Sequence, residues 1–124
     1  MGLRKLQDRC GTQARAMGWH DDWLALQWED DKFSEQERNW IAVKTALIAG
    51  EAHEAIEELR SNHHPRDVYY SEGGKPEGFG VELADVIIRT LDLAWLLDID
   101  LQELIDLKLL RNKDRGTRHG GKVM

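Results

Sequence analysis

The fold is decided by the segment at residues 81–97, VELADVIIRTLDLAWLL, because its apolar residues cover most of a helix. At about 100° per residue, the polar side chains share one stripe about 80° wide. This stripe consists of Glu82, Asp85, Arg89 and Asp92. A helix that is apolar on most sides is typical of the centre of a bundle or of an oligomer interface. We therefore expect a central helix whose narrow polar stripe is more than a solvent-facing surface.

Two pairs of carboxylates lie on predicted helices, Glu82-x-x-Asp85 on this segment and Glu51-x-x-Glu54 on a second helix. A three-residue separation turns a helix by about 300°, so each pair lies on one face. Two such faces brought together form a cage of oxygen ligands, which Mg²⁺ or its substitute Mn²⁺ prefers. A metal held in this way usually keeps positions open for water and phosphate oxygens. The spacing therefore predicts a metal site and phosphate chemistry.

The rest of the chain is also predicted to be helical, at intervals of three or four between apolar residues. Ser34-x-x-Glu37 and Asp100-x-x-Glu103 read as capping boxes that open two of the helices. On the helix that starts after Ser34, the apolar stripe runs directly into Glu51 and Glu54. The predicted helices are 3–17, 34–60, 81–97 and 100–112. The expected buried side of the second helix consists of Trp40, Val43, Leu47, Ile48, Ala55 and Leu59.

Two segments between these helices are predicted to be irregular. Residues 19–33 are rich in aromatic side chains and contain no helical period. Residues 61–80 hold both prolines of the chain and four of its glycines, so this segment is a loop, with a short extended piece at 68–70. His63 and His64 in this loop have no Cys or third spaced His beside them and do not predict a transition-metal site.

Composition limits the class of protein. The 124 residues suit one domain, which gains core by oligomerisation, and the single Cys10 fits a reducing compartment without disulfides. A net charge of -6 argues against binding a nucleic-acid backbone. The sequence contains no apolar run long enough to predict a membrane-spanning helix. We therefore expect a soluble, cytoplasmic protein.

The basic residues gather near the end of the chain, in contrast to the acidic second helix. We divide the sequence into an all-α catalytic domain at 1–112 and a basic tail at 113–124. Lys108, Asn112 and Arg115 share one side at spacings of four and three, and they could reach phosphate oxygens. Each of them alone also suits the C-terminal end of a helix, where cations are favourable.

Two further groups of residues complete a family pattern. The carboxylate pairs lie in Gly50-Glu51-Ala52-His53-Glu54-Ala55-Ile56-Glu57 and Gly78-Phe79-Gly80-Val81-Glu82-Leu83-Ala84-Asp85-Val86. Together they resemble the E-x-x-E, spacer, E-x-x-D hallmark of the MazG-like branch of the all-α nucleoside triphosphate pyrophosphohydrolases. The tail resembles the K, N, R and H-G-G-K elements of that branch, and Gly18-Trp19 with Asp21 and Asp22 resembles its G-W-x-D turn. The tail elements here are Lys108, Asn112, Arg115, Arg118, His119, Gly120, Gly121 and Lys122.

The resemblance implies a four-helix, bundle-like fold completed by a homodimer or homotetramer. It also implies Mg²⁺-dependent cleavage of a nucleoside triphosphate to the monophosphate and pyrophosphate, as in small house-cleaning nucleotide enzymes. The implied metal ligands and catalytic residues are Glu51, Glu54, Glu82 and Asp85. The alternatives are a non-catalytic nucleotide-binding module and the related phosphoribosyl-ATP pyrophosphatase.

The sequence offers candidates for the substrate contacts and for the general base, but it does not decide among all of them. Trp28, just before the second helix, is our candidate for stacking the base, because Trp40 and Trp95 lie on apolar faces. Arg89 either lines the metal site or pairs with Asp85 one turn away. The proton acceptor for the attacking water is Glu54, Glu57 or Glu58, and the sequence leaves the three open.

Overall fold

The structure is a computed structural model that describes residues 1–26 and 33–114, and most of these residues are helical. A small hairpin, which contains a 3-10 turn, connects the two longest helices. The elements in order are α1 (Leu3–Ala16), α2 (Asp21–Leu24), α3 (Glu35–Arg60), β1 (Tyr69–Tyr70), η1 (Glu72–Gly74), β2 (Pro76–Glu77), α4 (Phe79–Leu96) and α5 (Leu101–Asp114). The predicted all-α class and its four long helices are confirmed. None of the described helices is long and apolar enough to cross a membrane.

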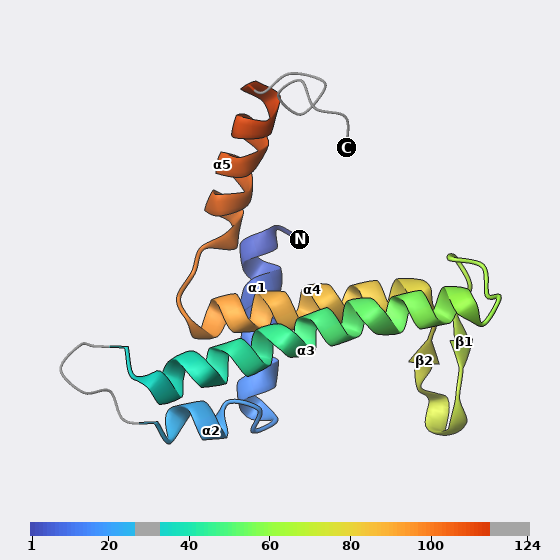
Figure 1. The fold of residues 1–124 in the computed structure, drawn as a ribbon, viewed down its shortest axis with the longest axis horizontal. Coiled ribbons are helices and arrows are strands. Elements are labelled where there is room, and N and C mark those ends of the chain that lie inside the picture. Colours follow the sequence, from blue (N-terminus) through green and yellow to red (C-terminus); the bar gives the residue numbers. More distant parts are fainter. Residues whose placement is uncertain (27–32, 115–124) are drawn as a thin grey trace.

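The body of the molecule is the pair α3 and α4, which lie side by side and antiparallel, with α1 crossing them (Figure 1). Antiparallel packing places the later part of α3 beside the start of α4. The hairpin that joins them lies at this end of the pair (Figure 1), where Tyr69 pairs with Glu77 and Tyr70 with Pro76. The predicted extended piece is thus confirmed at Tyr69–Tyr70. The arrangement brings the two carboxylate pairs to the same end of the molecule.

The start of α3 is fixed by the capping box that the sequence predicts. The Ser34 hydroxyl accepts a hydrogen bond from the Glu37 backbone N–H at 3.0 Å, and the Glu37 carboxylate accepts one from the Ser34 N–H at 2.8 Å. Both bonds satisfy backbone donors that the first turn of a helix leaves free. The capping box therefore sets where α3 begins, and Glu51 lies four to five turns further on.

The core between the helices is made mainly of small side chains, so the helices approach closely. Gly11 of α1 faces Trp95 of α4, and a Cβ at this position would overlap the indole ring. Any side chain here would push α1 off α4. Within residues 1–26 and 33–114, the buried apolar side chains are Cys10, Ala14, Trp23, Ala55, Leu91 and Ala94. Burial raises the pKa of the Cys10 thiol, so this cysteine behaves as a core residue.

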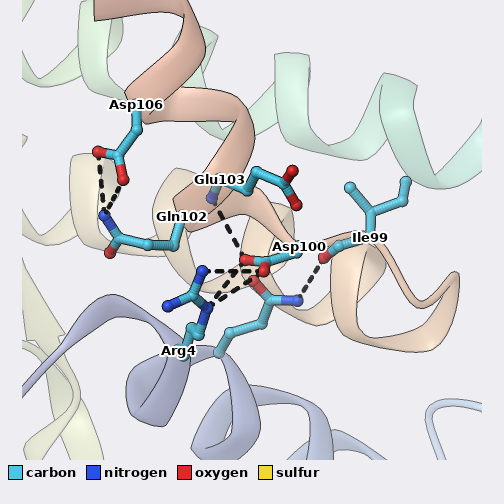
Figure 2. Close-up of polar contacts among 7 residues, drawn as sticks. Arg4, Ile99, Asp100, Gln102, Glu103 and Asp106 are labelled. Atoms are coloured by element: carbon cyan, nitrogen blue, oxygen red, sulfur yellow. Dashed lines mark hydrogen bonds and ion pairs between the residues drawn. The ribbon is translucent and has the colours of Figure 1, made fainter.

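Figure 2 shows how α5 is joined to α1 by polar contacts. The Arg4 guanidinium donates to the Asp100 carboxylate at 3.0 Å, and the Gln7 amide donates to the Ile99 carbonyl at 2.8 Å. Asp100 also accepts from the Glu103 backbone N–H at 3.3 Å, which is one half of the predicted capping box. The bond from Arg4 lowers the pKa of Asp100. Beyond this junction α5 projects away from the α3–α4 pair (Figure 1), so the single chain does not close a four-helix bundle.

The prediction that one side of α3 is buried is wrong for much of its length in the single chain. Ala55 is buried and Trp40 and Ile48 are half-buried, but Val43 is 59% exposed and Leu59 44%. Leu47 is exposed as well, and so are Leu83, Ile87 and Ile88 of α4. The physical reason is that α3 packs mainly against α4 on one side, while α1 and α3 cover only part of the circumference of α4. Contiguous exposed apolar side chains of this kind usually mark an interaction surface.

Candidate metal and nucleotide site

Three carboxylates meet where α3 and α4 pack together. Glu51 comes from α3, and Glu82 and Asp85 come from the first two turns of α4. Each offers one oxygen, and the three oxygens lie within 4.8 Å of one another. All three side chains are half-buried. The i, i+3 spacing on α4 and the antiparallel packing of α3 thus bring these three carboxylates together, as the sequence pattern predicted.

Glu54, the fourth predicted carboxylate, lies beside this cluster but not in it. It is exposed and lines the same cavity, which has a volume of about 500 Å³. We call this space the carboxylate cavity. Its lining consists of Trp19, Glu51, Glu54, Glu58, Lys75, Pro76, Glu77, Glu82, Asp85, Ile88 and Arg89. The structure therefore brings all four predicted residues to one cavity, with Glu54 outside the three-oxygen cluster.

Burial, followed by the crowding of like charges, raises pKa values in the cluster. The pKa of Glu82 is raised to about 7, first because the group is partly buried, then because it shares a hydrogen bond with Glu51, and then by the nearby negative charges. The pKa of Asp85 is also raised, by burial and then by the charge of Glu51, while Arg89 and Lys75 act in the opposite direction. Excess negative charge of this kind is what a divalent cation would neutralise.

Two cations share the cavity with the carboxylates. Arg89 donates from Nε to the Glu51 carboxylate at 2.8 Å, across the two helices. Of the two positions that the sequence left open for Arg89, the structure places this side chain in the lining of the carboxylate cavity, hydrogen-bonded to Glu51. Lys75, which lies between η1 and β2, also lines the cavity. Both side chains bring positive charge to the acidic cavity, and such groups can bind anions.

The hairpin that carries Lys75 is held to α3 by a hydrogen-bonded cluster. The Tyr69 hydroxyl donates to both oxygens of Glu58, at 2.7 and 2.8 Å, and His63 Nδ1 lies 3.0 Å from the same carboxylate. These contacts lower the pKa of Glu58, and the pKa of Tyr69 is raised to about 12. The His63 and Tyr69 rings lie 4.6 Å apart. His63 thus helps to hold the loop against Glu58 of α3.

A second cavity, of about 380 Å³, adjoins the first. We call it the aromatic cavity, because two indole rings form part of its wall. Its lining consists of Trp19, His20, Trp40, Lys44, Arg89, Asp92, Leu93 and Leu96. Trp19 and Arg89 line both cavities, so the acidic and aromatic spaces are neighbours.

A histidine and an aspartate form a buried pair at the wall of the aromatic cavity. His20 is 1% exposed, and its Nε2 lies 2.6 Å from Asp92. Arg15 donates from Nε to His20 Nδ1 at 3.2 Å. Because Nδ1 is the acceptor, Nε2 carries the hydrogen and donates it to Asp92. The His20 ring also stacks on Trp95 at a centroid distance of 5.7 Å, which fixes its orientation.

The other predicted substrate residues lie elsewhere. Lys108 and Asn112 are exposed on α5 and line neither cavity of their own chain. Trp28 and Arg115 lie outside the described residues. Lys108 and Asn112 lie away from the cavities because α5 projects away from the α3–α4 pair (Figure 1).

Sequence reasoning missed several residues of the two cavities. Asp92 was visible as a member of the polar stripe of α4, and Trp19 and His20 lie in the G-W-x-D turn, but no local pattern joined them. Lys75 and Tyr69 sit in a loop whose path is set by tertiary contacts. The one signal for this path is Gly78, whose φ of 140° and proximity to the Asp67 carbonyl exclude other residues.

No family model, curated protein or solved structure matches this chain. Its function must therefore be argued from the geometry of the two cavities and from the residues that line them.

The crowded cluster predicts a stability change that does not depend on a metal. The pKa of Glu82 is about 7 in the folded chain against an ordinary value of 4.5, so the folded state binds more protons than the unfolded state between these values. The free energy of unfolding then falls as the pH rises through this window. We expect Glu82→Gln to raise the Tm in metal-free buffer at about pH 8 and to change it less at about pH 5.

Differential scanning calorimetry of both proteins at the two pH values measures this effect. Glu72→Gln, an exposed carboxylate on η1, is the matched control and should leave the Tm unchanged at either pH. A Tm of Glu82→Gln that equals or falls below that of the parent at the higher pH would contradict the crowding of the cluster.

Proposed function

We infer that the chain is a Mg²⁺-dependent nucleoside triphosphate pyrophosphohydrolase, which cleaves an NTP or dNTP to the monophosphate and pyrophosphate. The observation that carries this proposal is the meeting of Glu51, Glu82 and Asp85, with three oxygens within 4.8 Å, in a cavity next to an aromatic one. The resemblance of both carboxylate motifs to the MazG-like pattern supports the same activity. A nucleotide has the matching combination of an anionic end and an aromatic end.

The three carboxylates fit a small divalent cation. Opposite ligands of Mg²⁺ are about 4 Å apart, close to the spread of the cluster, and oxygen is the ligand atom that Mg²⁺ and Mn²⁺ prefer. Glu51, Glu82 and Asp85 would hold the ion, and the open cavity leaves room for phosphate and water. A bound Mg²⁺ supplies neutralisation of phosphate charge and acidifies a water molecule.

The cations of the carboxylate cavity would position the triphosphate. Arg89 keeps donors beyond the one that it gives to Glu51, and a guanidinium can bind two phosphate oxygens at once. Lys75 adds a point charge from the hairpin, which the Glu58–Tyr69 hydrogen bonds hold in place. Positioning and charge stabilisation are the main contributions that a protein makes to phosphoryl chemistry.

The structure favours Glu54 among the three carboxylates proposed as general base. Glu58 is occupied by Tyr69 and His63, and its lowered pKa makes it a weak base. Glu57 pairs with Arg60 and does not line the carboxylate cavity. Glu54 lines that cavity and lies outside the three-oxygen cluster. It would accept the proton of the water that attacks the α-phosphorus, while the bond to the bridging oxygen breaks and pyrophosphate leaves.

The exposed apolar faces of α3 and α4 support the proposal of a homodimer or homotetramer. Val43 and Leu47 on α3, and Leu83 and Ile87 on α4, are pairs at i, i+4 and are at least 42% exposed. Neighbouring apolar positions on a helix form one stripe, which a second copy would cover. Lys108, Asn112 and Arg115 remain proposed substrate residues. Because α5 projects away from its own cavity, they would act on the site of a neighbouring copy.

Catalysis through the cluster predicts a loss of turnover when one charge is removed. Asp85→Asn removes charge that the cation needs, and Glu54→Gln removes the proton acceptor, while both keep the shape of the side chain. We expect each to reduce pyrophosphate release from nucleoside triphosphates with Mg²⁺ by at least about 100-fold. Circular dichroism should show an intact helical fold for both.

Asp106→Asn, an exposed carboxylate on α5, is the matched control and should keep full turnover. Activity that survives in both site variants would rule out the proposed site. Nucleotide binding without turnover in the parent protein would instead identify a non-catalytic nucleotide-binding module.

The assembly predicts a mass of at least two chains in solution. Light scattering at micromolar concentration measures it, and Ile87→Glu should reduce the mass to that of one chain, because a charge cannot be buried in an apolar interface without a partner. Asp106→Asn again serves as the control. A parent protein that is monomeric under these conditions refutes the proposed assembly.

A further inference from the structure

The aromatic cavity has the composition of a site for a flat heterocycle. Trp19, Trp40, Leu93 and Leu96 supply apolar wall, and the polar lining consists of His20, Lys44, Arg89 and Asp92. Trp40 is backed by the buried Trp23, with ring centroids 4.9 Å apart, so its plane is fixed. The Lys44 ammonium lies 4.9 Å from the centre of the Trp40 ring. The Trp40 ring, held by Trp23, and the Trp19 ring on the same cavity favour stacking of an aromatic ligand.

The position of this cavity along α4 suits one end of a nucleotide. Asp85 lines the carboxylate cavity, Arg89 lines both cavities, and Asp92 lines the aromatic one. From Asp85 to Asp92 the helix rises about 10 Å, which is comparable to the separation of the phosphate and the far edge of the base in a nucleotide. A single ligand could therefore place its phosphates on one side of Arg89 and its base on the other.

Asp92 is the polar group of this cavity with the clearest chemical preference. His20 donates to its Oδ1 at 2.6 Å, and Arg15 fixes the histidine from the opposite side. The histidine hydrogen is therefore already used, and Asp92 can offer the ligand only acceptors. An ionised carboxylate would accept from an exocyclic amino group. The imino N–H of uracil or thymine lies between two carbonyl oxygens, which the carboxylate would repel.

We propose that the aromatic cavity binds the base of the nucleotide and selects bases that carry an exocyclic amino group, with Asp92 as the specificity-determining residue. Selective hydrolysis of such nucleotides rests on the proposed function. Selective binding of the base does not, because Asp92 and His20 are not members of the carboxylate cluster. A phosphate in this cavity is disfavoured by Asp92, and a sugar hydroxyl is the competing donor that the experiment must separate.

The experiment compares cytidine with uridine, and guanosine with inosine. Cytidine carries an amino group where uridine has a carbonyl oxygen, and guanosine carries an amino group that inosine lacks. Tryptophan fluorescence reports binding, because Trp19 and Trp40 line the cavity. The same pairs are then tested as triphosphates for pyrophosphate release with Mg²⁺. We expect the parent protein to prefer the amino-bearing member about 10- to 100-fold, as for one hydrogen bond to a charged group.

In Asp92→Asn the amide oxygen can still accept from His20, and the amide NH2 group then faces the ligand as a donor. The preference for the amino-bearing base should therefore fall to within about threefold. Asp106→Asn is the control and should keep the parent preference. A parent protein without preference overturns the proposal on its own, even if Asp92→Asn does not fold. An equal loss of both members of a pair in Asp92→Asn assigns Asp92 to the sugar and also overturns it.

The two proposals fail in different ways. Amino-selective binding of nucleosides without triphosphate hydrolysis removes the proposed function and leaves the base site. Hydrolysis of all triphosphates at equal rates removes the base selection and leaves the function.

Discussion

The repulsion among Glu51, Glu82 and Asp85 is the constraint on which the rest of the site depends. Packing of α3 against α4 brings oxygens of three carboxylates to within 4.8 Å of one another, and burial together with the neighbouring negative charges raises the pKa values of Glu82 and Asp85. Arg89 offsets part of this charge through Glu51. Buried like charges are unfavourable unless they are neutralised. The fold thus keeps an arrangement that a divalent cation and a polyphosphate together would make favourable.

Most of the fold could be predicted because its signals are local. The capping box at Ser34 and the apolar run at 81–97 each lie within a few residues of the boundary they set, and the structure confirms the helices there. The short helix α2 was not predicted, since four residues hold too little periodicity. The pairing of β1 with β2 was missed for the same reason.

The site was predictable only in part. The i, i+3 spacing identified the carboxylates that one helix presents, and antiparallel packing brought three of the four together. The spacing could not show that Glu54 stays at the edge, or that Asp92 pairs with His20, which is 72 residues away in sequence. Contacts of this kind depend on the path of the chain. The expected burial of Val43 and Leu59 failed because periodicity identifies an apolar face but not the molecule that covers it.

The product of nucleotide cleavage tests the central claim most directly. Phosphorus NMR of a nucleoside triphosphate incubated with the protein and Mg²⁺ distinguishes the two bonds that water could attack. The account predicts resonances of the nucleoside monophosphate and pyrophosphate in equal amounts, and their disappearance with Asp85→Asn. Diphosphate and inorganic phosphate as products, or an unchanged triphosphate across amino-bearing and carbonyl-bearing bases, would contradict it.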